Sequence, residues 1–375
     1  MDILTTEEIK KRIGDLKVEQ ITVSGYEKIL KITSLKAKLK AIIAIHDTTL
    51  GLALGGIRIY PYKTFDDALT DVLRLSEGMT YKAAVAEVGL GGGKSVIIAD
   101  PKMDKTDELL LAFGEAVESL KGEYVCAEDL GCTLKDVKTV ASVTKYVTGL
   151  PHSKSSGNPS RFTAYGVFQG ILASAKFLFG SCNLEGKTVA IQGLGSVGRL
   201  LMDQLFWAGA NVIVSDVNAD NLHQVEQDCN AKIVSSEEIY KVKCDIFVPC
   251  AIGGIVNEET IKQFNCKAIA GCANNQLLKP EDANLLKEKN ILYAPDFVIN
   301  AGGLLNVTSE LDEEGYNPAK ARKHTSKIFD TLMSIFEISK NNNVSTYEAA
   351  ISLAKHKLKF GIGKRQIPPY FHHAE

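Results

Sequence analysis

The chain has 375 residues, of which 45% are hydrophobic and 23% charged, and its formal net charge is -2 at pH 7. This composition is typical of a globular protein of about two domains. The near-neutral charge offers no attraction for nucleic acid or for an acidic membrane surface, so neither is an expected partner. No window of about 18 uncharged apolar residues predicts a transmembrane helix.

The N-terminal segment and the cysteines indicate the cellular compartment. Residues 1–12 are charged and contain no apolar signal core, so we expect a protein that is not exported. The eight cysteines show no C-x-x-C pattern and no other common zinc spacing, so we expect no metal site. Several lie in apolar runs, where a reduced cysteine packs as a small hydrophobic residue. We therefore expect core thiols in a reducing cytoplasm.

Residues 1–148 mix strand and helix patterns and are predicted to form the first domain. Strands are predicted at 38–47 and 52–60, with a turn between them, and the apolar spacing of 65–79 predicts a helix. A short buried strand is predicted at 96–99. A loop rich in Ser, Gly and Pro begins near residue 151, and we place the domain boundary close to its start.

From residue 149 to 330 strand and helix patterns alternate. A helix is predicted at 198–209, and strands are predicted at 187–192, 211–215, 245–249, 268–271 and 291–293. This alternation predicts a doubly wound α/β domain, in which a parallel sheet carries helices on both faces. Residues 331–375 have helical patterns at 331–339 and 347–360, and we expect them to return to the first domain. The predicted fold class is therefore α/β with two domains.

A glycine-rich segment in the second domain predicts a dinucleotide site. It follows a predicted strand, opens a helix, and has the pattern G-x-G-x-x-G, formed by Gly193, Leu194, Gly195, Ser196, Val197 and Gly198. The first glycine suits a tight turn, the second lets a pyrophosphate approach the helix N-terminus, and the third allows close packing. Asp216 ends the next predicted strand. Because its carboxylate can bind ribose hydroxyls and repels a 2′-phosphate, NAD is favoured over NADP.

Two lysines lie in one short stretch of apolar and glycine residues. Lys82 has mostly small or apolar neighbours, and Lys94 follows three glycines. Burial lowers the pKa of a lysine, and a second lysine close by lowers it further. Such an amine can act as a base near neutral pH. A glycine-rich turn with two solvated lysines fits this stretch as well when it is considered alone.

The same stretch imitates a second phosphate-binding motif. Gly93-Lys94-Ser95 matches the end of a P-loop. That loop requires a glycine five positions before Gly93, where this chain has Val88. The sequence therefore does not predict an ATPase.

Ordered matches along nearly the whole chain identify a family resemblance. The matching stretches are 54–58, 78–82, 90–95, 127–131, 157–159, 163–166, 271–277 and 294–303. In these stretches the chain resembles the glutamate/leucine/phenylalanine/valine dehydrogenases, and among them the leucine dehydrogenases. The resemblance implies an NAD-dependent oxidoreductase that reversibly deaminates a branched-chain L-amino acid to a 2-oxo acid and ammonia. It also implies a homo-oligomer.

The resemblance assigns chemical roles to the charged residues. Lys82 and the backbone at Gly55 would bind the substrate carboxylate. Lys94 would be the general base, with a pKa lowered by Lys82 and by apolar surroundings, and Asp129 would be a second proton carrier. The alternative for Asp129 is a purely structural ion pair with a lysine.

Three polar residues resemble family positions around the reacting groups. Asn300 and Asn274 would orient the amino group of the substrate and the nicotinamide amide, and Thr163 would lie near the nicotinamide. For the two asparagines, a role in satisfying backbone groups of turns is the alternative.

The predicted substrate pocket is apolar. Leu54 stands where glutamate-specific members carry a lysine, and Val307 where they carry a serine, so an acidic side chain would be desolvated without a partner. Met79 belongs to the same apolar lining, and Ala127 fits the leucine branch. Leu304 stands where leucine-specific members often have valine. Phenylalanine dehydrogenase therefore remains the alternative within the family, and Leu, Val and Ile are not ranked.

Two further hypotheses come from other functional classes. A 2-hydroxy-acid oxidoreductase needs a His/Arg pair near the nicotinamide, but His152 and Arg161 lie in or beside the loop between the domains. A non-catalytic NAD-binding regulator would be expected to have lost at least one of three residues, all of which are present: Lys82, Lys94 and Asp129.

Overall fold

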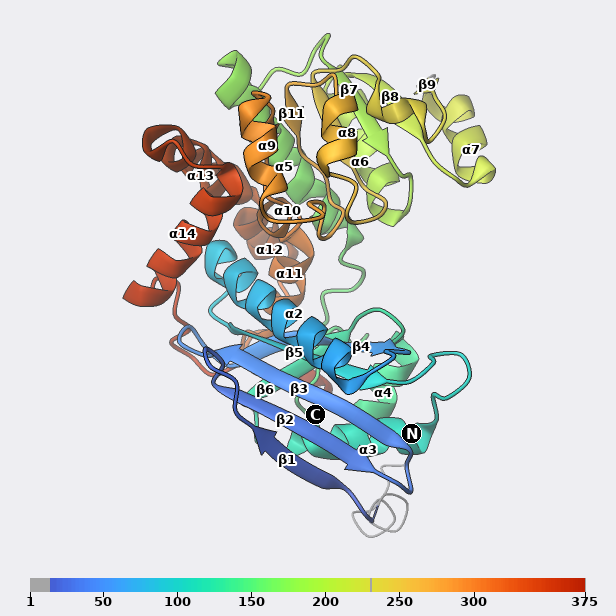
Figure 1. Ribbon diagram of the computed structural model, residues 1–375, viewed down its shortest axis with the longest axis vertical. Coiled ribbons are helices and arrows are strands. Elements are labelled where there is room, and N and C mark those ends of the chain that lie inside the picture. The colour runs from blue at the N-terminus through green and yellow to red at the C-terminus, as the bar shows by residue number, and fades with distance from the viewer. Residues whose placement is uncertain (1–13, 230, 375) are drawn as a thin grey trace. The chain divides into compact units, whose positions relative to one another are not determined.

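The computed structural model describes residues 14–229 and 231–374 (Figure 1). The segment 1–12, from which we predict that the protein is not exported, lies outside the described residues. The chain divides into two compact units. Unit 1 comprises Met1–Gly157, Val307–Asn317 and Lys355–Glu375, and unit 2 comprises Asn158–Asn306 and Pro318–Ala354.

These units differ from the predicted domains at three places. The first boundary falls at residue 157 rather than 148, and Val307–Asn317 belongs to unit 1. In addition, most of the C-terminal helical region belongs to unit 2. The reason is that α13 (Ile328–Asn342) packs against α5 (Ser160–Phe179) and α10 (Asp296–Ile299). Only the chain from Lys355 onward returns to unit 1.

Unit 1 is built on a six-stranded mixed sheet with the order β1-β2-β3-β5-β4-β6. Its strands are β1 (Lys17–Ile21), β2 (Lys28–Ser34), β3 (Leu39–Asp47), β4 (Ala53–Tyr60), β5 (Gly91–Ile98) and β6 (Tyr124–Glu128). β3 and β4 match the two predicted strands, but β5 lies between them in the sheet. The turn that joins them is therefore not a hairpin turn. β4 runs parallel to both β5 and β6.

Helices cover both faces of this sheet, α2 (Phe65–Ala86) on one and α3 (Asp107–Glu118) on the other (Figure 1). α2 begins at a capping box, in which Thr64 and Asp67 satisfy each other's backbone N–H groups. On the α2 face the core includes Ile42, Val72 and Val96. The opposite core is larger and includes α4 (Leu134–Ala141).

The segment that carries both lysines is more regular than predicted. α2 continues beyond residue 79 to Ala86, so Lys82 lies on the helix. β5 begins at Gly91, so the three glycines and Lys94 lie within a strand rather than in a turn. Glycine weakens a strand intrinsically, and here the close approach of neighbouring backbone explains its presence.

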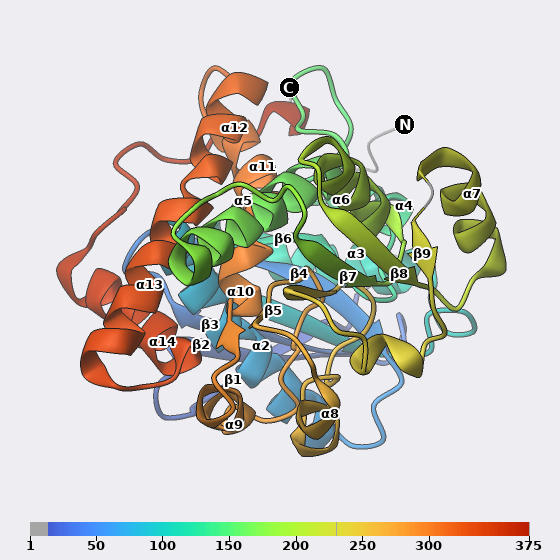
Figure 2. The ribbon, with the colours of Figure 1, turned by 90° about the horizontal axis from the view of Figure 1, so that it is seen from above.

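Unit 2 contains a six-stranded parallel sheet with the order β12-β11-β10-β7-β8-β9. Its strands are β7 (Thr188–Gln192), β8 (Asn211–Ser215), β9 (Lys232–Ile233), β10 (Ile246–Pro249), β11 (Ala268–Ile269) and β12 (Leu292–Tyr293). This order reverses between β7 and β10, as in a doubly wound sheet, and the predicted fold class is confirmed. The short edge strand β9, beside β8 in Figure 2, was not predicted.

The remaining helices are short to medium in length. They are α6 (Ser196–Trp207), α7 (Ala219–Cys229), α8 (Glu258–Gln263), α9 (Asp282–Glu288), α11 (Gly302–Thr308), α12 (Pro318–Ser326) and α14 (Thr346–Phe360). Single 3₁₀ turns occur at Glu238–Tyr240, Ser309–Leu311 and His372–Ala374. α11 and α14 each contribute residues to both units.

Among the described residues, one helix, α5, is long and apolar enough to span a membrane by length and composition alone. Its apolar surface is occupied within unit 2, where it packs against α6, α10, α12 and α13. Gly170 allows part of this contact, because a Cβ atom there would lie 2.4 Å from Ile299 Cγ1. Close helix packing thus accounts for the composition of α5.

Seven cysteines have free thiols, namely Cys126, Cys132, Cys182, Cys244, Cys250, Cys266 and Cys272. Cys126, Cys132 and Cys244 are buried as expected for core thiols, whereas Cys182 is exposed. Within the same residues, no group of three or more His, Cys, Asp or Glu side chains is arranged to hold a metal ion.

Candidate active site

A buried ion pair is the central feature of unit 1. Lys94 projects from β5, and its Nζ lies 2.9 Å from Oδ2 of Asp129, the residue that follows β6. The Lys94 side chain is only 7% exposed, and that of Asp129 is 28% exposed. The structure therefore brings together the two residues predicted to handle protons, in a place where water competes weakly for their charges.

Burial and neighbouring charges shift both groups. Burial lowers the pKa of the Lys94 amine, the Asp129 carboxylate opposes this change, and the Arg58 cation adds to the lowering. Burial alone would raise the pKa of Asp129, but Lys94 and Arg58 outweigh it, so this pKa is lowered. Arg58 is thus a cation that acts on Lys94, a role that the sequence did not predict for it.

Glycines on two strands make room for the ion pair. A Cβ atom at Gly56 would lie 2.6 Å from Asp129 Cβ and 3.2 Å from Lys94 Nζ. A Cβ atom at Gly92 would lie 2.1 Å from the Thr80 backbone nitrogen, so this glycine lets α2 approach β5. Residues two apart on a strand point to the same face. Lys94 therefore projects toward the α2 face, as Gly92 does.

The predicted substrate residues of unit 1 lie on the same elements. Lys82 and Met79 are half-buried on α2, and Thr80, which approaches Gly92 of β5, lies between them in the sequence. Leu54 is buried on β4, two residues before Gly56. The Gly55 carbonyl accepts a hydrogen bond of 2.8 Å from the Tyr124 hydroxyl, which fixes the backbone at this position.

Close packing also accounts for the paired glycines of β4. A Cβ atom at Gly55 would lie 1.8 Å from the Gly93 carbonyl oxygen, so no larger residue fits. Ala127 pairs with Gly56 across β4 and β6 and is partly buried. The small residues in this part of the sheet thus follow from its geometry.

A charged network behind the ion pair was not predicted as part of the site. Arg58 donates to Asp129 and, through Nη1, to Asp71 on α2 at 2.9 Å. The Tyr62 hydroxyl donates to the same Asp71 oxygen at 2.6 Å. The only signal in the sequence was that Arg58 belongs to a stretch matching the family, because its partners come from distant segments.

In unit 2 the glycine-rich segment forms the predicted strand–turn–helix. Gly193 has φ +96°, in the left-handed region that favours glycine, and its N–H donates to the Ser215 carbonyl at 2.8 Å. A Cβ atom at Gly198 would lie 2.1 Å from the Gly193 carbonyl oxygen, so the third glycine is needed for packing. A Cβ atom at Gly195 meets no atom within 4 Å. The space in front of Gly195 is open, as a bound pyrophosphate requires.

Asp216 is held beside this loop. Its Oδ2 accepts a hydrogen bond of 2.6 Å from the Leu194 N–H, and its Oδ1 accepts one of 2.7 Å from the Asn218 N–H. Burial acts to raise the pKa of Asp216, but these backbone donors outweigh it and keep the carboxylate ionised. Ser196 and Val197 form the first turn of α6, where no side chain caps the free N–H groups.

The polar residues predicted near the nicotinamide are distributed over unit 2. Asn300 is buried, and its Nδ2 donates to Asn274 Oδ1 at 2.7 Å and to the Cys272 carbonyl at 3.1 Å. The structure thus brings the two asparagines together. Thr163 lies in the first turn of α5, and its hydroxyl donates to the Pro159 carbonyl at 3.2 Å. Leu304 and Val307 lie on α11 and are partly buried.

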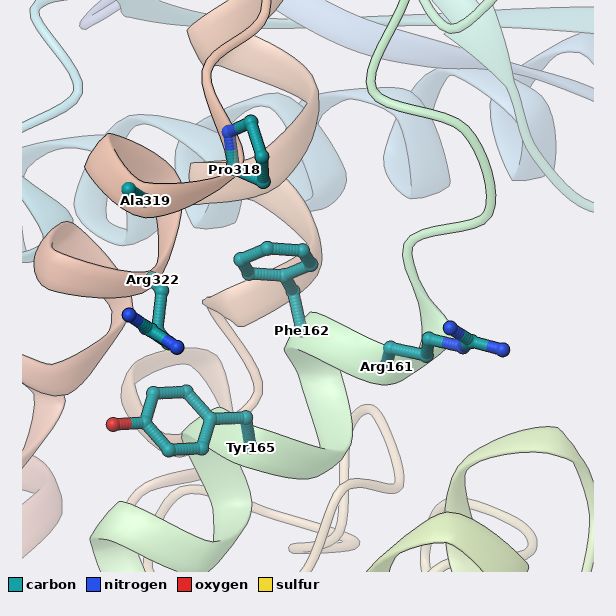
Figure 3. Close-up of a pocket in the computed structure, with 6 residues that line it drawn as sticks. All are labelled: Arg161, Phe162, Tyr165, Pro318, Ala319 and Arg322. Atoms are coloured by element: carbon teal, nitrogen blue, oxygen red, sulfur yellow. The ribbon is translucent and has the colours of Figure 1, made fainter.

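A pocket between α5 and α12 is separate from the predicted residues (Figure 3). The pocket is lined by Arg161, Phe162, Tyr165, Pro318, Ala319 and Arg322. The Arg322 side chain points toward the Tyr165 ring, whereas Arg161 points away from the other lining residues. Thr163 is adjacent to Phe162 in the sequence but does not line the pocket, so no predicted site residue faces it.

Comparisons with known proteins agree with this arrangement. Residues 31–148 match a family model described as the Glu/Leu/Phe/Val dehydrogenase dimerisation domain, and residues 216–359 match one described as Glutamate/Leucine/Phenylalanine/Valine dehydrogenase. Leucine dehydrogenase from Geobacillus stearothermophilus is 48% identical, over 89% of this chain and 91% of the relative. Phenylalanine dehydrogenase from Caldalkalibacillus thermarum is 46% identical, over 90% and 92%.

A solved structure is also similar over most of its length. The crystal structure of L-tryptophan dehydrogenase from Nostoc punctiforme has a TM-score of 0.82 and 46% identity, with coverage of 90% of this chain and 96% of that one. The doubly wound unit 2 and the buried Lys94–Asp129 pair of unit 1 fit the class of amino-acid dehydrogenases, to which the matched family models belong. The chain belongs to the glutamate/leucine/phenylalanine/valine dehydrogenase family. It is therefore an oxidoreductase of amino acids, and NAD is the cofactor of this family.

Proposed function

We propose that this protein catalyses the NAD-dependent, reversible oxidative deamination of branched-chain L-amino acids, namely L-leucine, L-valine and L-isoleucine. The products are the 2-oxo acid and ammonia. The observation that carries the chemical part of this proposal is the buried Lys94–Asp129 pair, with its 2.9 Å separation and its lowered lysine pKa.

The pair fits the proton transfers that oxidative deamination requires. Bound NAD would supply the hydride acceptor for the substrate α-carbon, and loss of this hydride would leave the substrate as an imine. Water then adds to the imine carbon, and the neutral Lys94 amine takes a proton from that water. Asp129 exchanges protons with the departing amino group. Because Lys94 is buried, its charged form is disfavoured and its pKa is lowered, which favours the neutral amine that can accept a proton.

The substrate carboxylate needs a cationic partner. Lys82 on α2 is assigned this role, together with the backbone at Gly55 on β4. The close packing of Thr80 on Gly92 fixes α2 against the strand that carries Lys94. The carboxylate anchor and the base are thus attached to elements that hold each other in place, as catalysis by orientation requires.

Unit 2 has the features that would hold NAD. Gly195 leaves open space where the pyrophosphate would lie, and the N-terminus of α6 presents N–H groups that no side chain caps. Asp216, ionised and fixed by two backbone donors, would bind the ribose hydroxyls. Its charge favours NAD over NADP, because a 2′-phosphate would lie next to a carboxylate. Asn300, Asn274 and Thr163 are assigned to the substrate amino group and the nicotinamide end.

The aliphatic side-chain preference rests on the residues of the predicted lining. Leu54 is 4% exposed, and Met79, Ala127, Leu304 and Val307 are partly buried. None of them can pair with a charge, so an acidic side chain would lose its hydration without compensation. The identity to proteins named leucine dehydrogenase also favours this preference.

Phenylalanine dehydrogenase is the second candidate within the same chemistry. Leu304, where leucine-specific members often have valine, is the residue that favours it. Relatives named phenylalanine dehydrogenase are 46% and 47% identical, nearly as similar as the leucine dehydrogenases. The two candidates differ only in the side chain that the pocket accepts.

We also infer that the protein assembles as a homo-oligomer. The matched model of residues 31–148 is described as a dimerisation domain. The sheet of unit 1 ends at β1, an edge strand that is mostly exposed, and the unpaired backbone groups of an edge strand can pair with another chain. Light scattering of the purified protein tests this inference, and a monomeric mass would contradict it.

The activity is tested by mixing the protein with NAD and L-leucine and following the absorbance of NADH. We expect NADH, 2-oxoisocaproate and ammonia in equal amounts. The parallel reaction with 2-hydroxyisocaproate should give no NADH. Turnover of the hydroxy acid without turnover of any amino acid would overturn the proposal in favour of a 2-hydroxy-acid dehydrogenase.

A further inference from the structure

A third charged side chain contacts the Lys94–Asp129 pair. Arg58 donates from Nε to Oδ2 of Asp129 at 3.1 Å, and the same oxygen lies 2.9 Å from Lys94 Nζ. One carboxylate oxygen therefore faces two cations. Any change in one cation alters the field at the other, because the site is largely buried.

Arg58 is anchored at its far end. Its Nη1 donates to Oδ2 of Asp71 at 2.9 Å, and Asp71 also accepts from the Tyr62 hydroxyl and from Arg74. The Arg58 side chain is 19% exposed and that of Asp71 is 18% exposed. A guanidinium with two carboxylate partners has a fixed orientation, which a lysine in its place could not reproduce.

The sheet determines where Arg58 points. Ile57, the residue before it, pairs with Glu128 on β6, the residue before Asp129. Ile57 also pairs with Ser95 on β5, the residue after Lys94. Strand register therefore places Arg58 and Asp129 side by side and brings Lys94 to the neighbouring strand position.

We propose that Arg58 is a positioning residue of this site: anchored on Asp71, it orients the Asp129 carboxylate and places a fixed positive charge beside Lys94, and so determines the pH range in which Lys94 can accept a proton. This inference rests on the proposed function for its catalytic meaning. Its physical content, the effect of Arg58 on the Lys94 amine, is independent of which substrate the enzyme uses.

The charges around Lys94 come from three directions. β4 contributes Arg58, α2 contributes Asp71 and carries Lys82, and the chain after β6 contributes Asp129. On the remaining neighbour, β3, the residue paired with Lys94 is Ala44, which carries no charge. Arg58 lowers the pKa of Lys94, whereas Asp129 and Asp71 raise it. The two members of the Arg58–Asp71 ion pair thus have opposite effects on the pKa of Lys94.

Because Arg58 and Asp71 have opposite effects, their substitution should shift the pH profile of kcat in opposite directions. Lys94 must be neutral to accept a proton, so activity is lost below its apparent titration. Arg58→Gln removes a cation, and the acid limb of the pH profile of kcat should move to higher pH by about one unit. Arg58→Lys keeps the charge and should hold the limb near the wild-type position, with a lower kcat. Asp71→Asn removes an anion, and the limb should move to lower pH.

The experiment measures two quantities in each variant. One is kcat for L-leucine against pH; the other is the rate at which acetic anhydride acylates Lys94 against pH, read by mass spectrometry of the Lys94 peptide. The acylation requires only a neutral amine, so it reports on Arg58 even if the protein does not oxidise L-leucine. Arg74→Gln is the matched control, because Arg74 contacts Asp71 from the surface and should shift neither curve.

The expected result is an upward shift of both curves in Arg58→Gln and a downward shift in Asp71→Asn. An equal loss of kcat at every pH in Arg58→Gln, with an unshifted acylation curve, would show that Arg58 only stabilises the fold. Equal shifts in Arg58→Lys and Arg58→Gln would also overturn the proposal, because the charge would then be irrelevant. Thermal unfolding of each variant identifies any that fail to fold. If the Arg58 variants do not fold, the proposal is decided by Asp71→Asn, whose kcat and acylation curves should both shift to lower pH.

Discussion

The functional features of the two units depend on different physical means. In unit 1 the decisive groups are side-chain charges held in a largely buried sheet, with Lys94 7% exposed and paired to Asp129. In unit 2 the decisive features are backbone and space: Gly193 in the left-handed region, and Gly195 with no atom within 4 Å of a Cβ position. Burial perturbs the lysine of the first unit, whereas the second needs an open surface that a charged ligand can approach.

This difference predicts different consequences of substitution. Changes to the charged residues of unit 1 should alter chemistry more than folding, because they remove a proton carrier or an anchor. Changes to the glycines of unit 2 should alter either folding or ligand binding, depending on where the added methyl group points.

Lys94→Ala gives the largest expected effect. It removes the amine that takes the proton of water, and kcat should fall by about 10²–10⁴ while the KM for L-leucine changes little. Lys105→Ala is the matched control, since Lys105 forms another partly buried ion pair, with Asp136 at 2.6 Å, and is not one of the predicted site residues. The control should lower stability without a comparable loss of kcat. Near-normal kcat in Lys94→Ala would remove the proposed base from the mechanism.

Lys82→Ala should have a different kinetic signature. Loss of the carboxylate anchor should raise the KM for L-leucine by about tenfold or more, with a smaller fall in kcat because the α-carbon is misplaced. Steady-state kinetics with L-leucine separates this result from that of Lys94→Ala. An unchanged KM would mean that the carboxylate is bound elsewhere.

Asp216→Ser tests whether the Asp216 carboxylate of unit 2 determines the preference for NAD over NADP. The wild-type protein should strongly prefer NAD, and the variant should narrow the NAD-to-NADP ratio of kcat/KM by roughly tenfold, because a carboxylate no longer faces the 2′-phosphate. The measurement is kcat/KM for both cofactors at saturating L-leucine. Equal use of both cofactors by the unmodified protein contradicts the assignment.

Two glycine substitutions separate ligand space from packing within unit 2. Gly195→Ala adds a methyl group in open space, so its Tm should be unchanged while the KM for NAD rises several-fold. Gly198→Ala places a Cβ atom against the Gly193 carbonyl and should lower the free energy of unfolding by about 1–3 kcal/mol. A loss of stability in Gly195→Ala, as large as that in Gly198→Ala, would show that the surface in front of Gly195 is not free.

The same difference between the two units explains why the features of unit 2 were easier to predict from the sequence than those of unit 1. Residues 193–198 are contiguous, and their backbone conformation requires glycine at fixed positions. Such a motif can be recognised directly in the sequence. The doubly wound sheet was predicted for a similar reason, since each buried strand is a short apolar run. The edge strand β9, with only Lys232–Ile233, has no such run and was not predicted.

The network of unit 1 could be predicted only in part. Arg58, Asp71 and Asp129 are distant in sequence, and only the pairing of β4 with β6 and the packing of α2 bring them together. The start of β5 at Gly91 was not predicted, because the sequence does not reveal that Thr80 approaches Gly92. The division of the C-terminal region also depends on long-range packing, of α13 on α5.

Substrate choice is the most direct test of the proposed function. The measurement is kcat/KM for L-leucine, L-valine, L-isoleucine, L-phenylalanine, L-tryptophan and L-glutamate at one saturating NAD concentration. We predict that the three aliphatic substrates fall within about 200-fold of one another, since one or two methylenes are worth roughly 1–3 kcal/mol. They should exceed the aromatic substrates, and L-glutamate should be negligible because the buried Leu54 offers its carboxylate no partner. L-glutamate as the best substrate would contradict the apolar pocket, and L-phenylalanine or L-tryptophan as the best would contradict the aliphatic assignment.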